Sequence, residues 1–157
     1  MDTTDFSIIN ELKDGRISFK RVADRLGLAE GTVRTRVRKL QNDGILDITG
    51  LVDPEKLPEH SVVMIGVQVR DMNLVKKAEE FSRLRGVISV CVVTGRFDLI
   101  ATVMLAKDFG ILEFYTEEAV KIANVQSVET FVVYKSFNLK VPLKSRQSDP
   151  LQATEGP

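Results

Sequence analysis

The 157-residue sequence has few of the residues on which most enzyme sites and secreted folds depend: one cysteine, one histidine and no tryptophan. Cys91 has no second cysteine for an internal disulfide, which argues against a disulfide-stabilised secreted domain. His60 belongs to no cluster with metal-ligand spacing. The chain also has no glycine-rich phosphate loop and no nucleophile motif. We therefore expect no enzyme, no catalytic residue, no metal and no cofactor.

Long apolar runs and a basic leader are also missing. No stretch approaches the roughly 20 apolar residues of a membrane helix, so we expect no membrane partner. The N-terminus is acidic, with Asp2 and Asp5, where a signal peptide would be basic. A composition of 43% hydrophobic and 28% charged residues is that of a globular protein. We expect a cytoplasmic protein.

The formal net charge is zero, but the charge is unevenly distributed. Residues 16–39 include eight basic residues but only two acidic residues, Asp24 and Glu30. The basic residues are Arg16, Lys20, Arg21, Arg25, Arg34, Arg36, Arg38 and Lys39. Because nucleic-acid binding needs a local basic surface rather than a basic protein, this segment is a candidate for DNA contact.

Residues 1–46 show the spacing of three short helices. Apolar residues at helical spacing predict a first helix over 5–12, which ends before Gly15. Ser18 is a candidate N-cap for a second helix that ends at Gly27, and a third helix follows over about 30–42. Two helices separated by a short turn with a glycine predict a helix-turn-helix DNA-binding domain.

The third helix has an apolar side and a polar, basic side. Val33, Val37 and Leu40 recur at i, i+4 and i+7 and should face the core. Since the major groove of B-DNA accepts one α-helix, the opposite side is the candidate interface with double-stranded DNA. Its predicted DNA-binding residues are Thr32, Arg34, Thr35, Arg36, Arg38 and Lys39. The simpler alternative is that these charges are only the solvated face of an amphipathic helix.

After helix three the helical period stops, and Pro54 and Pro58 are typical of a linker or turn. We assign residues 47–60 to a linker strand and hinge. Beyond it, β-branched runs predict strands over 62–69, 87–94, 97–105 and 125–137, and helical spacing predicts helices near 74–86 and 112–122. This βαββαβ order over 61–140 predicts a ferredoxin-like α+β domain. The polar residues 141–157 are expected to form a disordered tail.

Several of these strands are apolar on both faces. Val63 and Ile65 alternate with Val62 and Met64, and the strand over 97–105 repeats the pattern. Two helices cover only one face of a four-stranded antiparallel sheet, so the other face needs a second cover. A homo-oligomer built sheet against sheet would supply it. Cys91, in the middle of a strand, is expected to be a buried structural residue.

The loop over residues 94–98 has two readings. The simpler one is a tight connection in which Gly95 adopts a positive φ. In the other, free backbone groups at the glycine, beside the carboxylate of Asp98, hold the ammonium and carboxylate of an amino acid. Residue spacing alone favours the plain turn, because glycines are common in hairpin connections.

An ordered set of motifs runs through nearly the whole chain, from Asp5 to about Phe137. The N-terminal pieces are Asp5 with Ile8, Ile9 and Leu12; Asp14-Gly15-Arg16-Ile17-Ser18; Leu26-Gly27-Leu28 leading to Thr32-Val33; Arg36-Val37-Arg38-Lys39-Leu40; Gly44-Ile45; and Asp53-Pro54. The C-terminal pieces are Thr94-Gly95-Arg96-Phe97-Asp98 and Val125 followed by Thr130. The set resembles the Lrp/AsnC, or feast/famine, family of bacterial and archaeal transcriptional regulators.

The resemblance implies an N-terminal winged helix-turn-helix domain, a connecting strand and a C-terminal ferredoxin-like βαββαβ effector domain. It implies homodimers that commonly assemble to octamers, with the strand over 45–52 paired to its counterpart in the partner chain. It also implies a small-molecule effector, usually an amino acid, bound between effector domains. The effector-binding residues carried over from the family are Thr94, Gly95, Phe97, Asp98 and Thr130.

Two positions depart from the family pattern. Ala29 stands where a serine usually caps helix three, and Phe97 stands where tyrosine is common, which removes a hydroxyl that would bond an effector. Two alternatives stay open beside a DNA-binding regulator. One is an enzyme resembling the siroheme decarboxylases, which share the two-domain architecture, and the other is a metabolite-sensing module without DNA binding.

Overall fold

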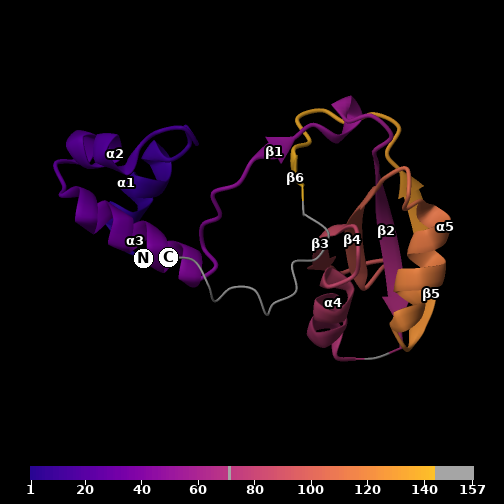
Figure 1. Cartoon of the computed structure of the whole chain (residues 1–157). Helices are drawn as coiled ribbons and strands as arrows, with labels where there is room; N and C mark the ends of the chain where they lie inside the picture. The colour runs from indigo at the N-terminus through magenta and orange to yellow at the C-terminus, as the bar shows by residue number, and fades with distance from the viewer. Residues whose placement is uncertain (71, 144–157) are drawn as a thin grey trace, which may run out of the picture. The chain divides into compact units, whose positions relative to one another are not determined.

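A computed structural model describes residues 1–70 and 72–143 of the chain. It divides into two compact units, residues 1–50 and the residues from Leu51 onward. Figure 1 shows a helical N-terminal unit and a C-terminal unit built on a sheet. The second unit begins within the predicted linker of residues 47–60, ahead of the predicted start of the C-terminal domain at 61.

The N-terminal unit consists of α1 (Thr3–Glu11), α2 (Phe19–Leu26) and α3 (Glu30–Asn42). Its apolar residues meet in one small core, formed by Ile8, Val22, Ala23, Val33 and Val37. The Ser18 side chain accepts a hydrogen bond from the Arg21 amide, as expected for the N-cap of α2. The three predicted helices are confirmed.

The turn between α2 and α3 is made by Gly27, Leu28 and Ala29. Gly27 has φ +65°, the left-handed conformation that glycine adopts without strain, and the Leu28 amide donates to the Ala23 carbonyl at 2.9 Å. Ala29 provides no side-chain hydrogen bond to cap α3, as its methyl group dictates. The chain over 45–50 then adopts neither helix nor strand.

The C-terminal unit is a four-stranded antiparallel sheet in the order β3-β4-β2-β5. The strands are β2 (Ser61–Val69), β3 (Val87–Val92), β4 (Leu99–Leu105) and β5 (Val125–Val132). The first helix is α4 (Leu74–Ser82). The second begins as α5 (Ile111–Glu113) and continues through a π-turn over Phe114–Glu118 and a 3₁₀ turn over Ala119–Lys121. The predicted βαββαβ order and α+β class are confirmed.

One face of the sheet is covered and the other is open. Ile65, Val67, Ala101 and Val103 pack with Phe81 and other residues of the helical layer in the main core. On the opposite face, which we call the open face, Met64 and Phe131 are register partners and are 40% and 43% exposed. The expectation that Cys91 is buried was wrong: it is exposed, because it pairs with Ile100 on an edge strand and neither helix covers that face.

A second, two-stranded sheet joins β1 (Leu51–Val52) to β6 (Val141–Pro142). The 3₁₀ turn η1 (Pro54–Lys56) follows β1. Two ion pairs reinforce this pairing, Asp53 to Lys140 at 2.9 Å and Glu55 to Lys135 at 2.6 Å. Residues 141 and 142, expected to open a disordered tail, thus form a strand, whereas 144–157 lie outside the described residues. The strand partner of β1 is within its own chain.

Candidate nucleic-acid interface and effector site

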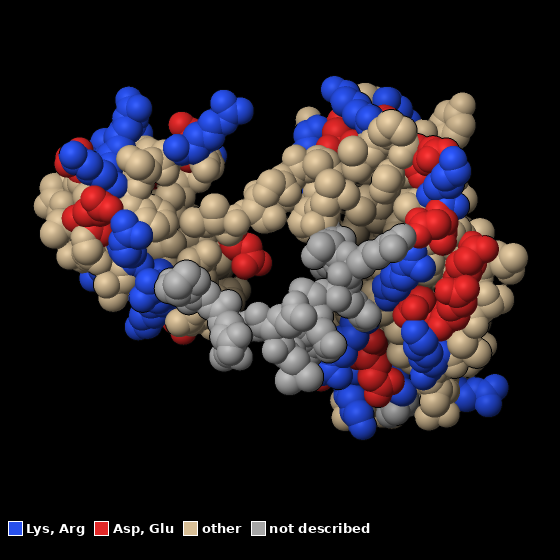
Figure 2. Space-filling view, viewed as in Figure 1, with Lys and Arg blue, Asp and Glu red and all other residues tan. Residues whose placement is uncertain are grey.

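The outer side of α3 is polar and accessible. Val33, Val37 and Leu40 are buried on its inner side, as the apolar period predicted. Figure 2 shows basic side chains projecting from the N-terminal unit. Five of the six predicted DNA-binding residues are exposed, namely Thr32, Arg34, Thr35, Arg38 and Lys39.

These basic side chains are held in different ways. Arg34 forms an ion pair with Glu30 at 2.7 Å, and its guanidinium lies over the ring of Phe19 at 5.6 Å. Among the described residues, Arg38 and Lys39 form no ion pair. The charges of Arg38 and Lys39 are therefore not offset by a carboxylate of the described residues.

Arg36 is only partly exposed and is bound to α1. Its Nη1 atom donates to Oδ2 of Asp2 at 2.7 Å and to Oδ1 of Asp5 at 2.8 Å. The sequence placed Arg36 on the outer side of α3 but gave no sign of these ion pairs, because their partners are 31 and 34 residues away. An Asp-x-x-Asp pair at the start of a helix is a capping signal, which marks these carboxylates in the sequence but does not indicate a contact with Arg36.

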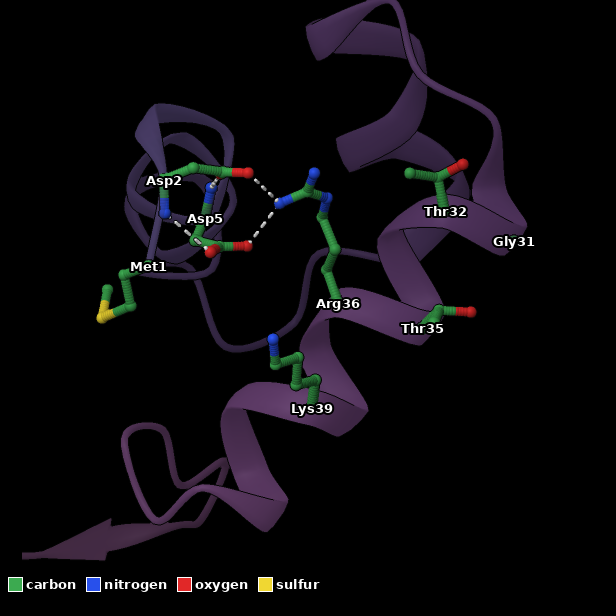
Figure 3. A pocket seen from close by; sticks show the side chains of 8 residues that line it. All are labelled: Met1, Asp2, Asp5, Gly31, Thr32, Thr35, Arg36 and Lys39. Carbon is green, nitrogen blue, oxygen red and sulfur yellow. Dashed lines mark hydrogen bonds and ion pairs between the residues drawn. The ribbon is translucent and has the colours of Figure 1, made fainter.

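A shallow hollow lies between the start of α1 and the outer side of α3 (Figure 3). Hydrogen bonds from Arg36 and from backbone amides lower the pKa of Asp2 and of Asp5. The same two carboxylates raise the pKa of Arg36. All three groups are therefore ionised at neutral pH. The hollow is lined by Met1, Asp2, Asp5, Gly31, Thr32, Thr35, Arg36 and Lys39.

The predicted effector loop connects β3 to β4. Thr94 and Gly95 are exposed, and Gly95 has φ +124°, which confirms the predicted positive φ. Phe97 turns back over the open face: a Cβ on Gly66 would lie 2.7 Å from its ring, and its ring meets that of Phe131 at 5.9 Å. The aromatic ring thus occupies the space that the glycine leaves.

Asp98 fixes the end of β2. Its carboxylate accepts a hydrogen bond from the Val69 amide at 2.9 Å, and its own amide donates to the Val67 carbonyl at 2.9 Å. Close by, Arg96 forms an ion pair with Glu129 at 2.7 Å. The Asp98 carboxylate, which the sequence suggested as a partner for the ammonium of a ligand, is therefore already hydrogen-bonded to the Val69 amide.

Thr130 lies on the other face of the sheet from Phe97. It is the register partner of the buried Ile65, so its side chain lies on the helix-covered face, where its hydroxyl hydrogen-bonds the Tyr115 hydroxyl at 2.6 Å. Within one chain the structure brings together residues 94–98 but not Thr130. Tyr115 was not among the predicted site residues, although it is the polar partner of Thr130.

Two kinds of feature are absent from residues 1–70 and 72–143. No helix there has the length and apolar character needed to cross a membrane. The same residues contain no group of three or more histidine, cysteine or acidic side chains arranged to hold a metal ion.

The fold and the outer side of α3 define a class: a helix-turn-helix DNA-binding unit joined to an α+β unit. Residues 1–47 match the family model of winged helix-turn-helix DNA-binding domains. Residues 62–142 match that of the Lrp/AsnC ligand binding domain. The protein belongs to the Lrp/AsnC family of transcriptional regulators, as the sequence resemblance indicated.

Similar proteins align with this chain over most of their own length. The regulator PH0140 of Pyrococcus horikoshii is 31% identical, over 85% of this chain and 85% of its own. The regulator Ptr1 of Methanocaldococcus jannaschii is 26% identical, over 87% of this chain and 94% of its own. These relatives are named as transcriptional regulators, so an enzyme resembling siroheme decarboxylases is not favoured.

Solved structures show the same fold. Escherichia coli AsnC superimposes with a TM-score of 0.63 at 22% identity, over 87% of this chain and 93% of its own. The regulator NMB0573 of Neisseria meningitidis, solved as a complex with L-Met, gives 0.64 at 21% identity, over 97% of both chains.

Proposed function

We propose that this DNA-binding transcriptional regulator recognises a specific operator through α3, acts as a homodimer and responds to a small molecule. The observation that carries the DNA interface is the division of α3 into a buried side and an exposed polar side. A helix of this kind fits the major groove, with arginine and threonine directed at base edges and phosphates. The proposed contacts are Thr32, Arg34, Thr35, Arg36, Arg38 and Lys39.

The test is binding of the full chain to DNA as a function of salt. We expect the affinity for fragments of its own genome to fall steeply as salt rises, because bound phosphates release counterions. The double variant Arg38→Glu/Lys39→Glu should abolish binding at 150 mM salt. Lys76→Glu, on the outer side of α4, is the matched control and should bind as the wild type does. Unchanged binding by the double variant would remove α3 from the interface.

The open face supports the proposed homodimer. It presents Met64 and Phe131 to solvent in the single chain, and a second copy would cover them without any other partner. Assembly of dimers to octamers is the further expectation from the family. Pairing of β1 with its counterpart would have to use the strand edge that β6 leaves free.

The family model and the relative solved with L-Met support a small-molecule effector, and we propose an amino acid or a related metabolite. The proposed site residues are Thr94, Gly95, Phe97, Asp98 and Thr130. Phe97 and Thr130 lie on opposite faces of the sheet in one chain, so we place the ligand between copies, where it contacts Phe97 of one copy and Thr130 of another.

Thermal melting of the protein with each of the twenty amino acids tests this proposal. A ligand at 100 times its dissociation constant stabilises the folded state by about 2.7 kcal/mol, which is a measurable shift in Tm. One compound that raises the Tm would identify the effector class. If none does, the amino-acid proposal fails.

A further inference from the structure

Arg36 is held by a closed set of hydrogen bonds at the start of α1. The Asp5 amide donates to Oδ1 of Asp2 at 2.9 Å, and the Asp2 amide donates to Oδ2 of Asp5 at 2.9 Å. The remaining oxygen of each carboxylate accepts from Nη1 of Arg36. We call this arrangement of Asp2 and Asp5 the carboxylate clamp. Each carboxylate in it is fixed at both oxygens.

The charge of this cluster does not suit a phosphate contact. Two carboxylates and one guanidinium, all ionised at neutral pH, sum to one negative charge. A DNA phosphate that approached Arg36 would therefore also approach Asp2 and Asp5. The neighbouring Arg38 and Lys39 have no such carboxylates in the described residues and can provide the phosphate contacts.

The donors that remain on Arg36 suit a base instead. A guanidinium has five N–H groups, and the clamp uses the two on Nη1. Figure 3 shows both dashed lines ending on that one nitrogen. Nε and the second terminal nitrogen, Nη2, make no hydrogen bond with the described residues. Their parallel N–H groups match the O6 and N7 acceptors that guanine presents in the major groove.

The clamp also fixes the arginine before DNA arrives. A long side chain loses rotamer freedom when it binds, and holding it in advance reduces that loss. The Arg36 side chain is 33% exposed and lines the hollow on the outer side of α3, so the clamp leaves part of this side chain accessible. Thr32, Thr35 and Lys39 line the same hollow.

We propose that Arg36 reads a guanine base and that Asp2 and Asp5 are its positioning residues. This inference rests on the proposed function, namely that α3 enters the major groove. It assigns Arg36 to sequence discrimination, and Arg38 and Lys39 to general affinity for the backbone.

The experiment first uses the full-length wild-type chain to select its preferred site from random double-stranded DNA. Each guanine of that site is then replaced by 7-deazaguanine, which loses the N7 acceptor but still pairs with cytosine. We expect one guanine per half-site at which replacement weakens wild-type binding by about 5-fold or more, the lower end of the range for a whole bidentate contact, because O6 still accepts one hydrogen bond. In Arg36→Ala the same replacement should have no effect.

The clamp is tested with Asp2→Asn/Asp5→Asn. Asparagine caps a helix as well as aspartate does, so this double variant removes charge while α1 keeps its cap. We expect weaker discrimination at that guanine, by tenfold or more, and non-specific affinity that is unchanged or higher. Arg36→Lys, which keeps one cation but lacks the planar fork, should lose the guanine preference and remain folded. Lys39→Ala, the control, should weaken binding to all sequences alike and reduce the salt slope by about one phosphate.

Three results would overturn the proposal. If no guanine depends on Arg36, or if Arg36→Ala weakens all sequences alike with a reduced salt slope, Arg36 is not a base reader. If the double asparagine variant lowers the Tm but keeps full discrimination at the guanine, the clamp is structural only. The failure of the proposed function is a separate result: the wild-type chain would then select no sequence and bind DNA without salt dependence.

Discussion

Four of the predicted DNA-binding residues of α3 are basic, and their contacts make them different. Arg34 is paired with Glu30 within its own helix, whereas Arg36 is bound to two carboxylates of another helix. Arg38 and Lys39 remain without an ion pair among the described residues. Charge reversal at these four positions should thus have unequal effects on DNA binding, and the largest loss of general affinity is expected at Arg38 and Lys39.

A second residue-scale constraint is the contact of Phe97 with Gly66. A methyl group at residue 66 would lie 2.7 Å from the Phe97 ring, so we predict that Gly66→Ala displaces the ring. Crowding of this kind costs about 1–3 kcal/mol of the free energy of unfolding. Urea unfolding measures this cost when Gly66→Ala is compared with the wild type, and Gly66→Ala/Phe97→Ala with Phe97→Ala. The cost should disappear in the Phe97→Ala background, and an equal cost in both would show that the ring is not the obstacle.

At the scale of elements, η1 is fastened to the segment that follows β5. The Glu55 carboxylate accepts hydrogen bonds from Lys135 Nζ and from both the amide and the hydroxyl of Ser136. These contacts lower the pKa of Glu55 from 4.5 to about 2. Together with the β1–β6 pairing, they hold the start of the C-terminal unit against its last described residues.

The lowered pKa gives this anchor a defined pH dependence. A carboxyl whose pKa is depressed on folding adds stability that is fully present above its unfolded pKa of about 4.5 and is lost as the pH falls through about 2. We predict that an NMR titration places the Glu55 carboxyl midpoint near 2. In the double variant Lys135→Met/Ser136→Ala, the midpoint of the Glu55 titration should rise toward 4.5. A wild-type midpoint already near 4.5 would show that the anchor does not form in solution.

Elements built on local patterns were predictable from the sequence. The bounds of α3, the Ser18 cap and the turn at Gly27 follow from periodicity and from what each residue type permits. The β1–β6 pairing was not predictable, because two-residue strands 90 positions apart leave no periodic signal. The region after Gly110 was predicted as one helix, but its backbone passes through α, π and 3₁₀ turns, which depend on packing rather than on spacing.

In the candidate sites, too, local patterns were predictable from the sequence and long-range contacts were not. The exposed side of α3 could be predicted because burial follows the helical period. The carboxylate clamp, the Tyr115–Thr130 hydrogen bond and the contact of Phe97 with Gly66 join residues distant in sequence, and only the fold brings them together. The exposure of Cys91 was missed because the sequence shows an apolar strand but not which face the helices cover.

At the scale of the whole molecule, the proposed homodimer depends on the open face. We predict that Met64→Lys weakens self-association by more than about 100-fold, because an ammonium group would be buried against the second copy without a counter-charge. Sedimentation equilibrium measures this directly. Val75→Lys on α4, where the native side chain is 74% exposed, is the matched control and should associate normally. A wild-type chain that is monomeric at high concentration would contradict the homodimer itself.

The short β1–β6 sheet also determines where the chain can be divided for domain replacement or truncation. Residues 51 and 52 pair with 142 and 141, so the start of the C-terminal unit lies beside the end of its described part. The peptide passes from one unit to the other once, after Gly50. Replacing residues 1–50 with another DNA-binding domain should therefore leave the fold of the C-terminal unit unchanged, whereas a truncation before Val141 should remove the strand that pairs with β1.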